Sequence, residues 1–143
     1  MNKKGQAAME FLMTYGWAIL VVLVAIAALA YFGVLNPERF LPSNCVIAPG
    51  ISCDDFKVEA SQMTIILRNG MGDDLTSVNI TSAGCTVDYT TTSWNNGNTV
   101  TAILTGCDNG ATGARFKQDV NVTYTSGSGL PHTKTGEITT QVE

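Results

Sequence analysis

The stretch that decides the fold is FLMTYGWAILVVLVAIAALAYFGVL, residues 11–35. These 25 residues contain no Asp, Glu, Lys, Arg or His. As an α-helix they would extend about 37 Å, enough to cross the hydrocarbon core of a bilayer. The run is too long for a cleaved secretory leader, whose apolar stretch is about 7–15 residues. We therefore expect a helix that is retained in the mature protein, as a membrane anchor or packed against copies of itself.

The rest of the chain has a different composition. Residues 36–143 are rich in Thr, Ser, Asn and Gly, contain all four cysteines and carry 11 of the 12 acidic side chains. The whole chain has a net charge of -4, which argues against a nucleic-acid partner because such binding relies on basic surfaces. Lys3 and Lys4 precede the apolar run, so the positive-inside rule keeps the N-terminus in the cytoplasm and places residues 36–143 outside.

A short polar motif stands before the apolar helix. Lys3-Lys4-Gly5-Gln6 is followed four residues later by Glu10. A buried carboxylate must be paired or neutralised, although at headgroup level the helix dipole alone would favour it. Together these residues resemble the N-terminus of the archaeal type IV pilin family with a class III signal peptide. In that family a basic leader ends in Gly, the mature chain starts at Gln, and Glu stands at the fifth mature position.

The resemblance covers residues 1–35 and implies a route of maturation. A prepilin-type signal peptidase would cut between Gly5 and Gln6, which creates a new α-ammonium group at Gln6. The pilus assembly ATPase and its membrane platform would then move the helix from the lipid into a helical filament of identical subunits. There Glu10 of one copy could pair with the Gln6 ammonium of its neighbour, which offsets the desolvation of both charges.

The predicted organisation is a leader at 1–5, an apolar helix at 6–36, a connector at 37–55 and a head at 56–143. Three segments of the head alternate apolar and polar residues, which is typical of half-buried strands. Seven short strands predict an antiparallel β-sandwich, and with the helix an α+β fold. The expected strands are 56–60, 63–68, 77–81, 85–89, 99–104, 120–124 and 134–141. Asn69-Gly70, Asn96-Gly97 and Asn109-Gly110 are expected to form turns with positive φ.

The four cysteines lie in the segment expected outside the cell, where disulfides form. Cys45, Cys53, Cys85 and Cys107 allow three pairings. We favour Cys45 with Cys53 and Cys85 with Cys107, because each joins near neighbours that flank a turn or hairpin. Zinc is a poor alternative, since the chain has no C-x-x-C and His132 is its only histidine. No metal or cofactor is expected.

Two N-x-T sequons occur, Asn79-Ile80-Thr81 and Asn121-Val122-Thr123. Both asparagines fall on the polar side of an alternating strand, so we expect them to be exposed. In an exported head such asparagines are candidates for N-glycosylation.

The sequence contains no catalytic motif: G-x-S-x-G, H-E-x-x-H and a Gly-rich phosphate loop are all missing. We therefore expect a structural subunit rather than an enzyme, namely a pilin of an extracellular filament that serves surface attachment. Its precursor would sit in the cytoplasmic membrane. The alternatives are a subunit of an archaellum, a minor or initiating pilin, and a monomeric membrane-anchored β-sandwich that binds a ligand and keeps residues 1–5.

Overall fold

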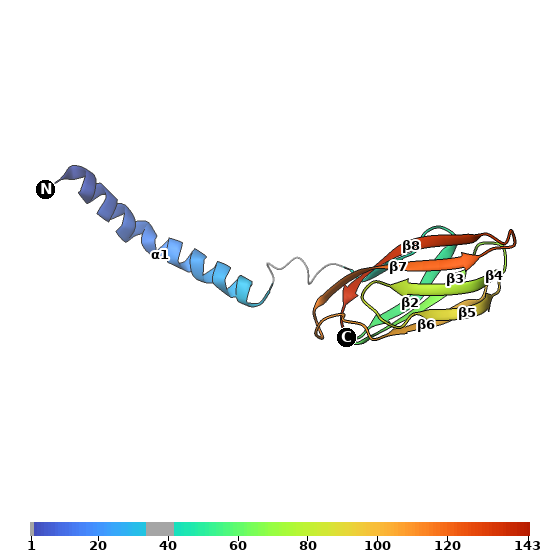
Figure 1. Ribbon diagram of the computed structural model, residues 1–143. Coiled ribbons are helices and arrows are strands. Elements are labelled where there is room, and N and C mark those ends of the chain that lie inside the picture. Colours follow the sequence, from blue (N-terminus) through green and yellow to red (C-terminus); the bar gives the residue numbers. More distant parts are fainter. Residues whose placement is uncertain (1, 34–41) are drawn as a thin grey trace. The chain divides into compact units, whose positions relative to one another are not determined.

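The computed structural model describes residues 2–33 and 42–143 (Figure 1). The chain divides into two units, of which the first contains one helix and the second, Pro42–Glu143, contains all the described strands. A long apolar helix followed by antiparallel sheets confirms the predicted α+β class.

Helix α1 spans Lys3–Tyr31. It starts inside the expected leader and ends before the expected boundary at 36, which lies outside the described residues. At its end the amide of Phe32 donates to the carbonyl of Ala28, and Gly33 takes a φ of 71°, a conformation that glycine adopts without strain. No residue of α1 is buried, and its large apolar side chains are between 45% (Leu29) and 87% (Tyr31) exposed.

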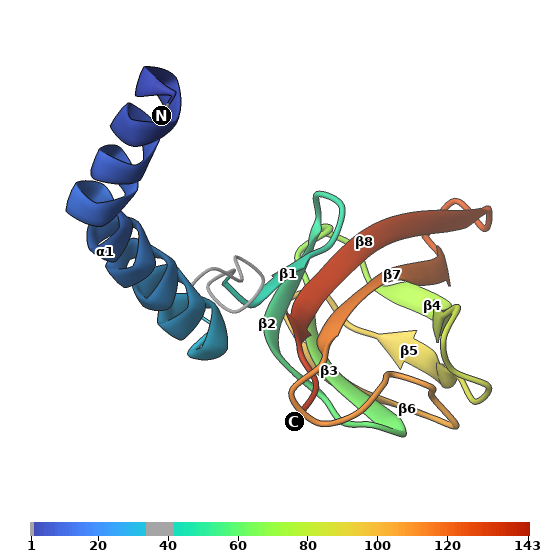
Figure 2. The same cartoon turned by 90° about the vertical axis from the view of Figure 1, so that its left-hand side faces the viewer.

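The head consists of two antiparallel sheets (Figure 2). The five-stranded sheet has the order β1-β8-β7-β4-β5, and the three-stranded sheet has the order β2-β3-β6. The strands are β1 (Asn44–Val46), β2 (Ile51–Val58), β3 (Gln62–Asn69), β4 (Leu75–Ser82), β5 (Tyr89–Trp94), β6 (Thr99–Thr105), β7 (Arg115–Thr125) and β8 (Pro131–Gln141).

The core lies between the two sheets and follows from the alternation in the strands. In β3 every second residue is fully buried, and β4 and β7 supply the facing apolar side chains. The largest fully buried side chains are Trp94, Met63, Ile65, Leu67, Leu75, Ile80, Leu104, Ile138, Val58, Val78, Val120 and Val122. Among the described residues, the buried hydrophobic ones fall between Ile47 and Val142, so the head carries a core of its own.

Several predicted boundaries in the head are wrong. Residues 85–88 form no strand: Val87 makes an isolated bridge, to Thr105, and strand β5 begins at Tyr89, the last residue of the expected strand. The sequence of β5, YTTTSW, is polar on both faces, so it gives no alternating signal. The expected connector 37–55 also contains β1 and the first five residues of β2, so from Pro42 onward it belongs to the head.

The three Asn-Gly pairs behave differently from one another. Gly97 and Gly110 have φ values of 79° and 95°, as expected for turns, but Gly70 is outside the left-handed region. Asn69, which precedes it, is the fully buried last residue of β3, and its Nδ2 donates to the carbonyl oxygens of Asp73 and Trp94. This asparagine therefore organises neighbouring loops instead of supplying a left-handed turn.

Candidate functional site

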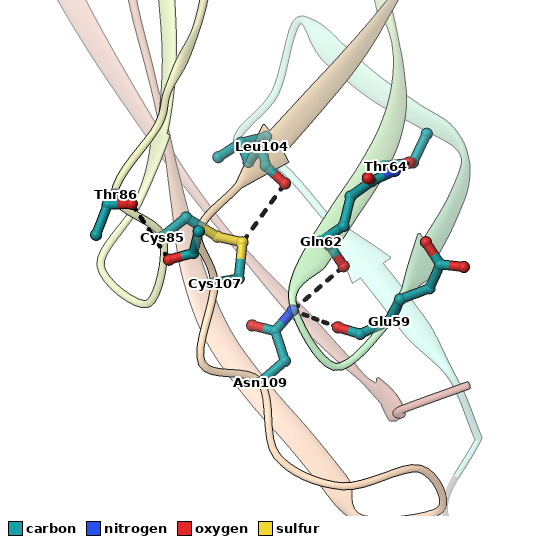
Figure 3. The surroundings of a disulfide bond; sticks show 9 residues. Glu59, Gln62, Thr64, Cys85, Thr86, Leu104, Cys107 and Asn109 are labelled. Atoms are coloured by element: carbon teal, nitrogen blue, oxygen red, sulfur yellow. Dashed lines mark hydrogen bonds between the residues drawn. A yellow bond between two sulfur atoms is a disulfide. The ribbon is translucent and has the colours of Figure 1, made fainter.

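Both disulfides follow the favoured pairing. Cys45 of β1 is bonded to Cys53 of β2, with Cα atoms 6.0 Å apart, which ties the five-stranded sheet to the three-stranded sheet. Cys85, just after β4, is bonded to Cys107, just after β6 (Figure 3). Each bond therefore crosses between segments of different sheets, as is useful for a small exported domain.

The second disulfide lies close to a buried asparagine. Figure 3 shows Asn109 beside Cys107, with its amide pointing to the turn between β2 and β3. Its Nδ2 donates to the carbonyl oxygens of Glu59 and Gln62, at 2.7 and 3.3 Å. The loop after β6 is thus held both by a covalent bond and by hydrogen bonds.

The residues of the predicted cleavage site lie in the first turn of α1. The amides of Gly5 and Gln6 donate to the carbonyl oxygen of Asn2, at 3.0 and 3.3 Å. A Cβ added at Gly5 would meet no atom within 4 Å, so packing within the chain gives no reason for a glycine there. A glycine inside a helix lowers the stability of that helix by about 1 kcal/mol relative to alanine. Its presence here points to a requirement other than folding.

Glu10 lies on the exposed surface of α1, one turn after Gln6. Its backbone carbonyl accepts a hydrogen bond from the Thr14 hydroxyl at 2.9 Å. Among the described residues no basic group lies within ion-pair distance of its carboxylate. The described chain therefore offers this carboxylate no countercharge of its own, and a buried state would need one from another molecule.

Helix α1 is long and apolar enough to cross a membrane, with a mean hydropathy of 2.4 over its most apolar 18-residue window, none of which is buried. The rings of Phe11 and Tyr15 lie tilted against each other near one end, with centroids 4.9 Å apart, and those of Tyr31 and Phe32 meet edge to face at the other, 5.6 Å apart. Aromatic pairs at both ends of an apolar span are typical of membrane interfaces.

The two sequons lie side by side on neighbouring strands. In the register of β4 and β7, Asn79 is opposite Thr123, and Thr81 is opposite Asn121. Both asparagines are therefore on the outer face of the five-stranded sheet, as the alternation predicted, but each is only half-exposed. Sequence reasoning could assign each residue to a face; it could not pair the strands, because alternation carries no information about the neighbouring strand.

The surroundings of the two asparagine amides differ. Oδ1 of Asn121 accepts a hydrogen bond from the Thr135 hydroxyl of β8, at 2.8 Å. Oδ1 of Asn79 is buried and has no hydrogen-bond partner. Threonines surround both residues: Thr133, Thr123 and Thr90 continue the cross-strand row of Asn79.

Ionisable groups in the described part of the head form surface pairs. Nε and Nη2 of Arg68 contact Oδ2 of Asp54 at 2.9 and 2.7 Å, and this hydrogen bonding lowers the pKa of the Asp54 carboxyl. Lys57 contacts Glu59 at 2.8 Å, which raises the pKa of the lysine. Across residues 2–33 and 42–143, no group of three or more His, Cys, Asp or Glu side chains is arranged to hold a metal ion.

No model of a known protein family matches the sequence, and no curated protein matches it.

Proposed function

We propose that this protein is a pilin, the structural subunit of an archaeal extracellular type IV pilus. The observation that carries the proposal is helix α1, 29 residues long, with none of its residues buried against the described chain. Apolar surface of this extent is stable only in lipid or against other apolar surfaces. A pilin meets both conditions in turn, because its helix rests in the cytoplasmic membrane before assembly and in the filament core afterwards.

Gly5 supports the processing step of this proposal. The glycine stands in an open position of α1, where packing against the described residues does not require it, and recognition by the peptidase would account for it. Cleavage after Gly5 would remove Lys3 and Lys4, the two charges that hold the N-terminus on the cytoplasmic side. The mature helix would then begin at Gln6 with a single positive group, its α-ammonium.

Glu10 supports the assembly step. Its carboxylate has no basic partner within ion-pair distance among the described residues, and in a bundle of apolar helices it would lie in a medium of low dielectric. The α-ammonium at Gln6 of a neighbouring copy is a partner of opposite charge. Such a pair favours one axial register between helices, because any other register leaves both charges unpaired. The main partners in this proposal are therefore further copies of the chain.

The head supports an extracellular location. Two disulfides and a Thr-rich outer face suit an oxidising, proteolytic environment. In the filament the heads would form the outer surface and serve attachment, while the chemistry of assembly would belong to the peptidase, the ATPase and the membrane platform.

The experiment is mass spectrometry of the N-terminal peptide from filaments sheared off the cell surface. We expect high-molecular-weight material whose chains start at Gln6. A Gly5→Val variant serves as the matched control, because a Cβ added at this position has no atom within 4 Å, whereas the substitution alters the cleavage site. That variant should accumulate in the membrane with residues 1–5 attached. Wild-type protein found only in membranes with Met1 retained would contradict the proposal and favour the anchored binding module.

A further inference from the structure

A bulge in β4 sets the direction of Asn79. Between Thr76 and Asn79 the strand contains one more residue than the facing part of β7, where Thr125 and Thr123 are the partners. The extra residue is Ser77, whose φ of 49° is in the left-handed region that residues other than glycine rarely adopt. As a result Leu75 and Val78, three positions apart, are both buried, and Asn79 faces outward.

The surface beside Asn79 is hollow. A shallow depression of about 600 Å³ covers the outer side of β4 and the edge strand β5, lined by Ser77, Val78, Asn79, Thr90, Thr91 and Thr92. Because Oδ1 of Asn79 is the buried atom of the amide, Nδ2 is the atom directed to the solvent side. Asn79 thus presents its amide nitrogen next to this hollow.

Asn121 lies one strand further from the edge of the sheet than Asn79 does. Its strand, β7, is the middle strand of the five-stranded sheet, and Thr81 and Thr135 stand directly opposite it on either side. The Thr135 hydroxyl also holds its Oδ1. As diagonal neighbours on one face, Asn79 and Asn121 have Cα atoms about 7–8 Å apart, so saccharides on both would crowd each other.

The order in which the strands are synthesised also distinguishes the two asparagines. A sequon within a central strand is accessible to an enzyme only before the strand pairs. The chain from Asn79 to Asn121 adds 42 residues, which take about 2–8 s to synthesise. On one side Asn79 pairs with Thr90 of β5, which follows after 11 residues, but its other side stays open until Thr123 of β7 is made. Asn121 finds Thr81 of β4 already present, and its other side is closed after 14 residues by Thr135 of β8.

We propose that Asn79 is the N-glycan acceptor of this head and that its saccharide occupies the depression over β5, which leaves Asn121 unmodified. The proposal rests on the export of the head that the proposed function includes. A membrane oligosaccharyltransferase would use a saccharide carried on a lipid phosphate or pyrophosphate. The bond from C1 of the sugar to the phosphate oxygen breaks, the bond from C1 to Nδ2 forms, and the proton lost from Nδ2 ends on the leaving phosphate.

The test is glycopeptide mapping of the full chain, produced in cells that possess this transferase, with intact mass to count saccharides. Wild-type protein should carry its saccharide on Asn79. Asn79→Gln should abolish it, and so should Thr81→Val, which removes the sequon hydroxyl while keeping the shape and the strand preference of the side chain. The matched changes on β7, Asn121→Gln and Thr123→Val, should leave occupancy at Asn79 intact.

The possible outcomes distinguish a failure of the proposal for Asn79 from a failure of the pilin proposal. A saccharide mainly on Asn121, equal occupancy of both sites, or filaments that start at Gln6 and carry no saccharide would overturn the proposal for Asn79 alone. A saccharide on Asn79 in chains that retain Met1 and never assemble would support it and contradict the pilin proposal. Thr81→Ser, which preserves the sequon, should retain the modification, and its loss there would indicate disturbed folding rather than a lost acceptor.

Discussion

Cys45 and Cys53 join β1 to β2 at the place where the head begins, so that the two sheets are covalently connected within its first 12 residues. Strand β1 has only three residues and pairs with β8 through Asn44, Cys45 and Val46. Three residue pairs hold a strand weakly, so the disulfide is the firmest attachment of this segment.

Replacing both Cys45 and Cys53 with serine should lower the free energy of unfolding of the 42–143 head by about 2.6 kcal/mol, from the entropy of the opened loop. The head suits this measurement because it carries its whole core. Denaturant unfolding of the oxidised and serine variants would show the difference. The matched pair at Cys85 and Cys107 closes a longer loop and should cost more, about 3.4 kcal/mol; a smaller loss there would contradict the entropic account.

Gly136 of β8 lies under the segment that follows β1. A Cβ at this position would collide with the Ile47 side chain and the carbonyl oxygen of Val46, and the backbone cannot move aside as a flexible side chain would. We expect Gly136→Ala to destabilise the head by about 1–3 kcal/mol, as overpacking usually does. Gly127→Ala is the control: its Cβ meets no atom within 4 Å, and the change should stay within about 0.5 kcal/mol. Thermal unfolding of both variants measures the contrast.

Asn69 supplies three hydrogen bonds to its surroundings. Besides its two donated bonds, its Oδ1 accepts from the amide of Met71 at 3.0 Å. Asn69→Ala should cost about 1–3 kcal/mol for each buried group left without a partner. Asn69→Asp keeps the acceptor but turns a carboxylate toward two carbonyl oxygens, so its loss of stability should be larger at pH 7 than at pH 3. Equal losses at both pH values would show that the side chain is hydrated in the folded head.

The limits of sequence reasoning in this chain are physical. The helix was predictable because 25 uncharged residues have few other stable conformations, and β3 because Met63, Ile65 and Leu67 alternate strictly with polar or half-buried neighbours. Strand β5 was missed because its stability comes from pairing with β4 and from the terminal Trp94, not from an apolar face. The opposition of the two sequons depends on the bulge at Ser77, which no local pattern announces.

Asp54 and Arg68 predict a dependence of stability on pH. Hydrogen bonding to Arg68 lowers the pKa of Asp54 in the folded state. A carboxyl with a lowered folded pKa stabilises the fold above its unfolded pKa of about 3.9 and loses that contribution as the pH falls through the folded value. Arg68→Gln should therefore lose less stability between pH 6 and pH 3 than the wild type does. Because the pair is exposed, the difference should shrink in 1 M salt. If the free energy of unfolding fell equally with pH in the two proteins, the proposed link between stability and the protonation of Asp54 would be wrong.

Glu10→Gln tests the assembly proposal at a single atom, because the amide keeps the size of the side chain and removes its charge. If Glu10 pairs with the α-ammonium of Gln6 in a neighbouring copy, the variant should insert into the membrane and be cleaved normally, yet form few filaments. Its membrane pool should rise as the sheared fraction falls, as measured by quantitative immunoblotting of both fractions. Glu137→Gln is the control, since that carboxylate lies on the exposed face of β8, where it contacts Lys117 at 3.4 Å and accepts a hydrogen bond from the Thr139 hydroxyl at 3.4 Å; it should assemble like wild type. Normal filaments from Glu10→Gln would show that the helices find their register by packing alone.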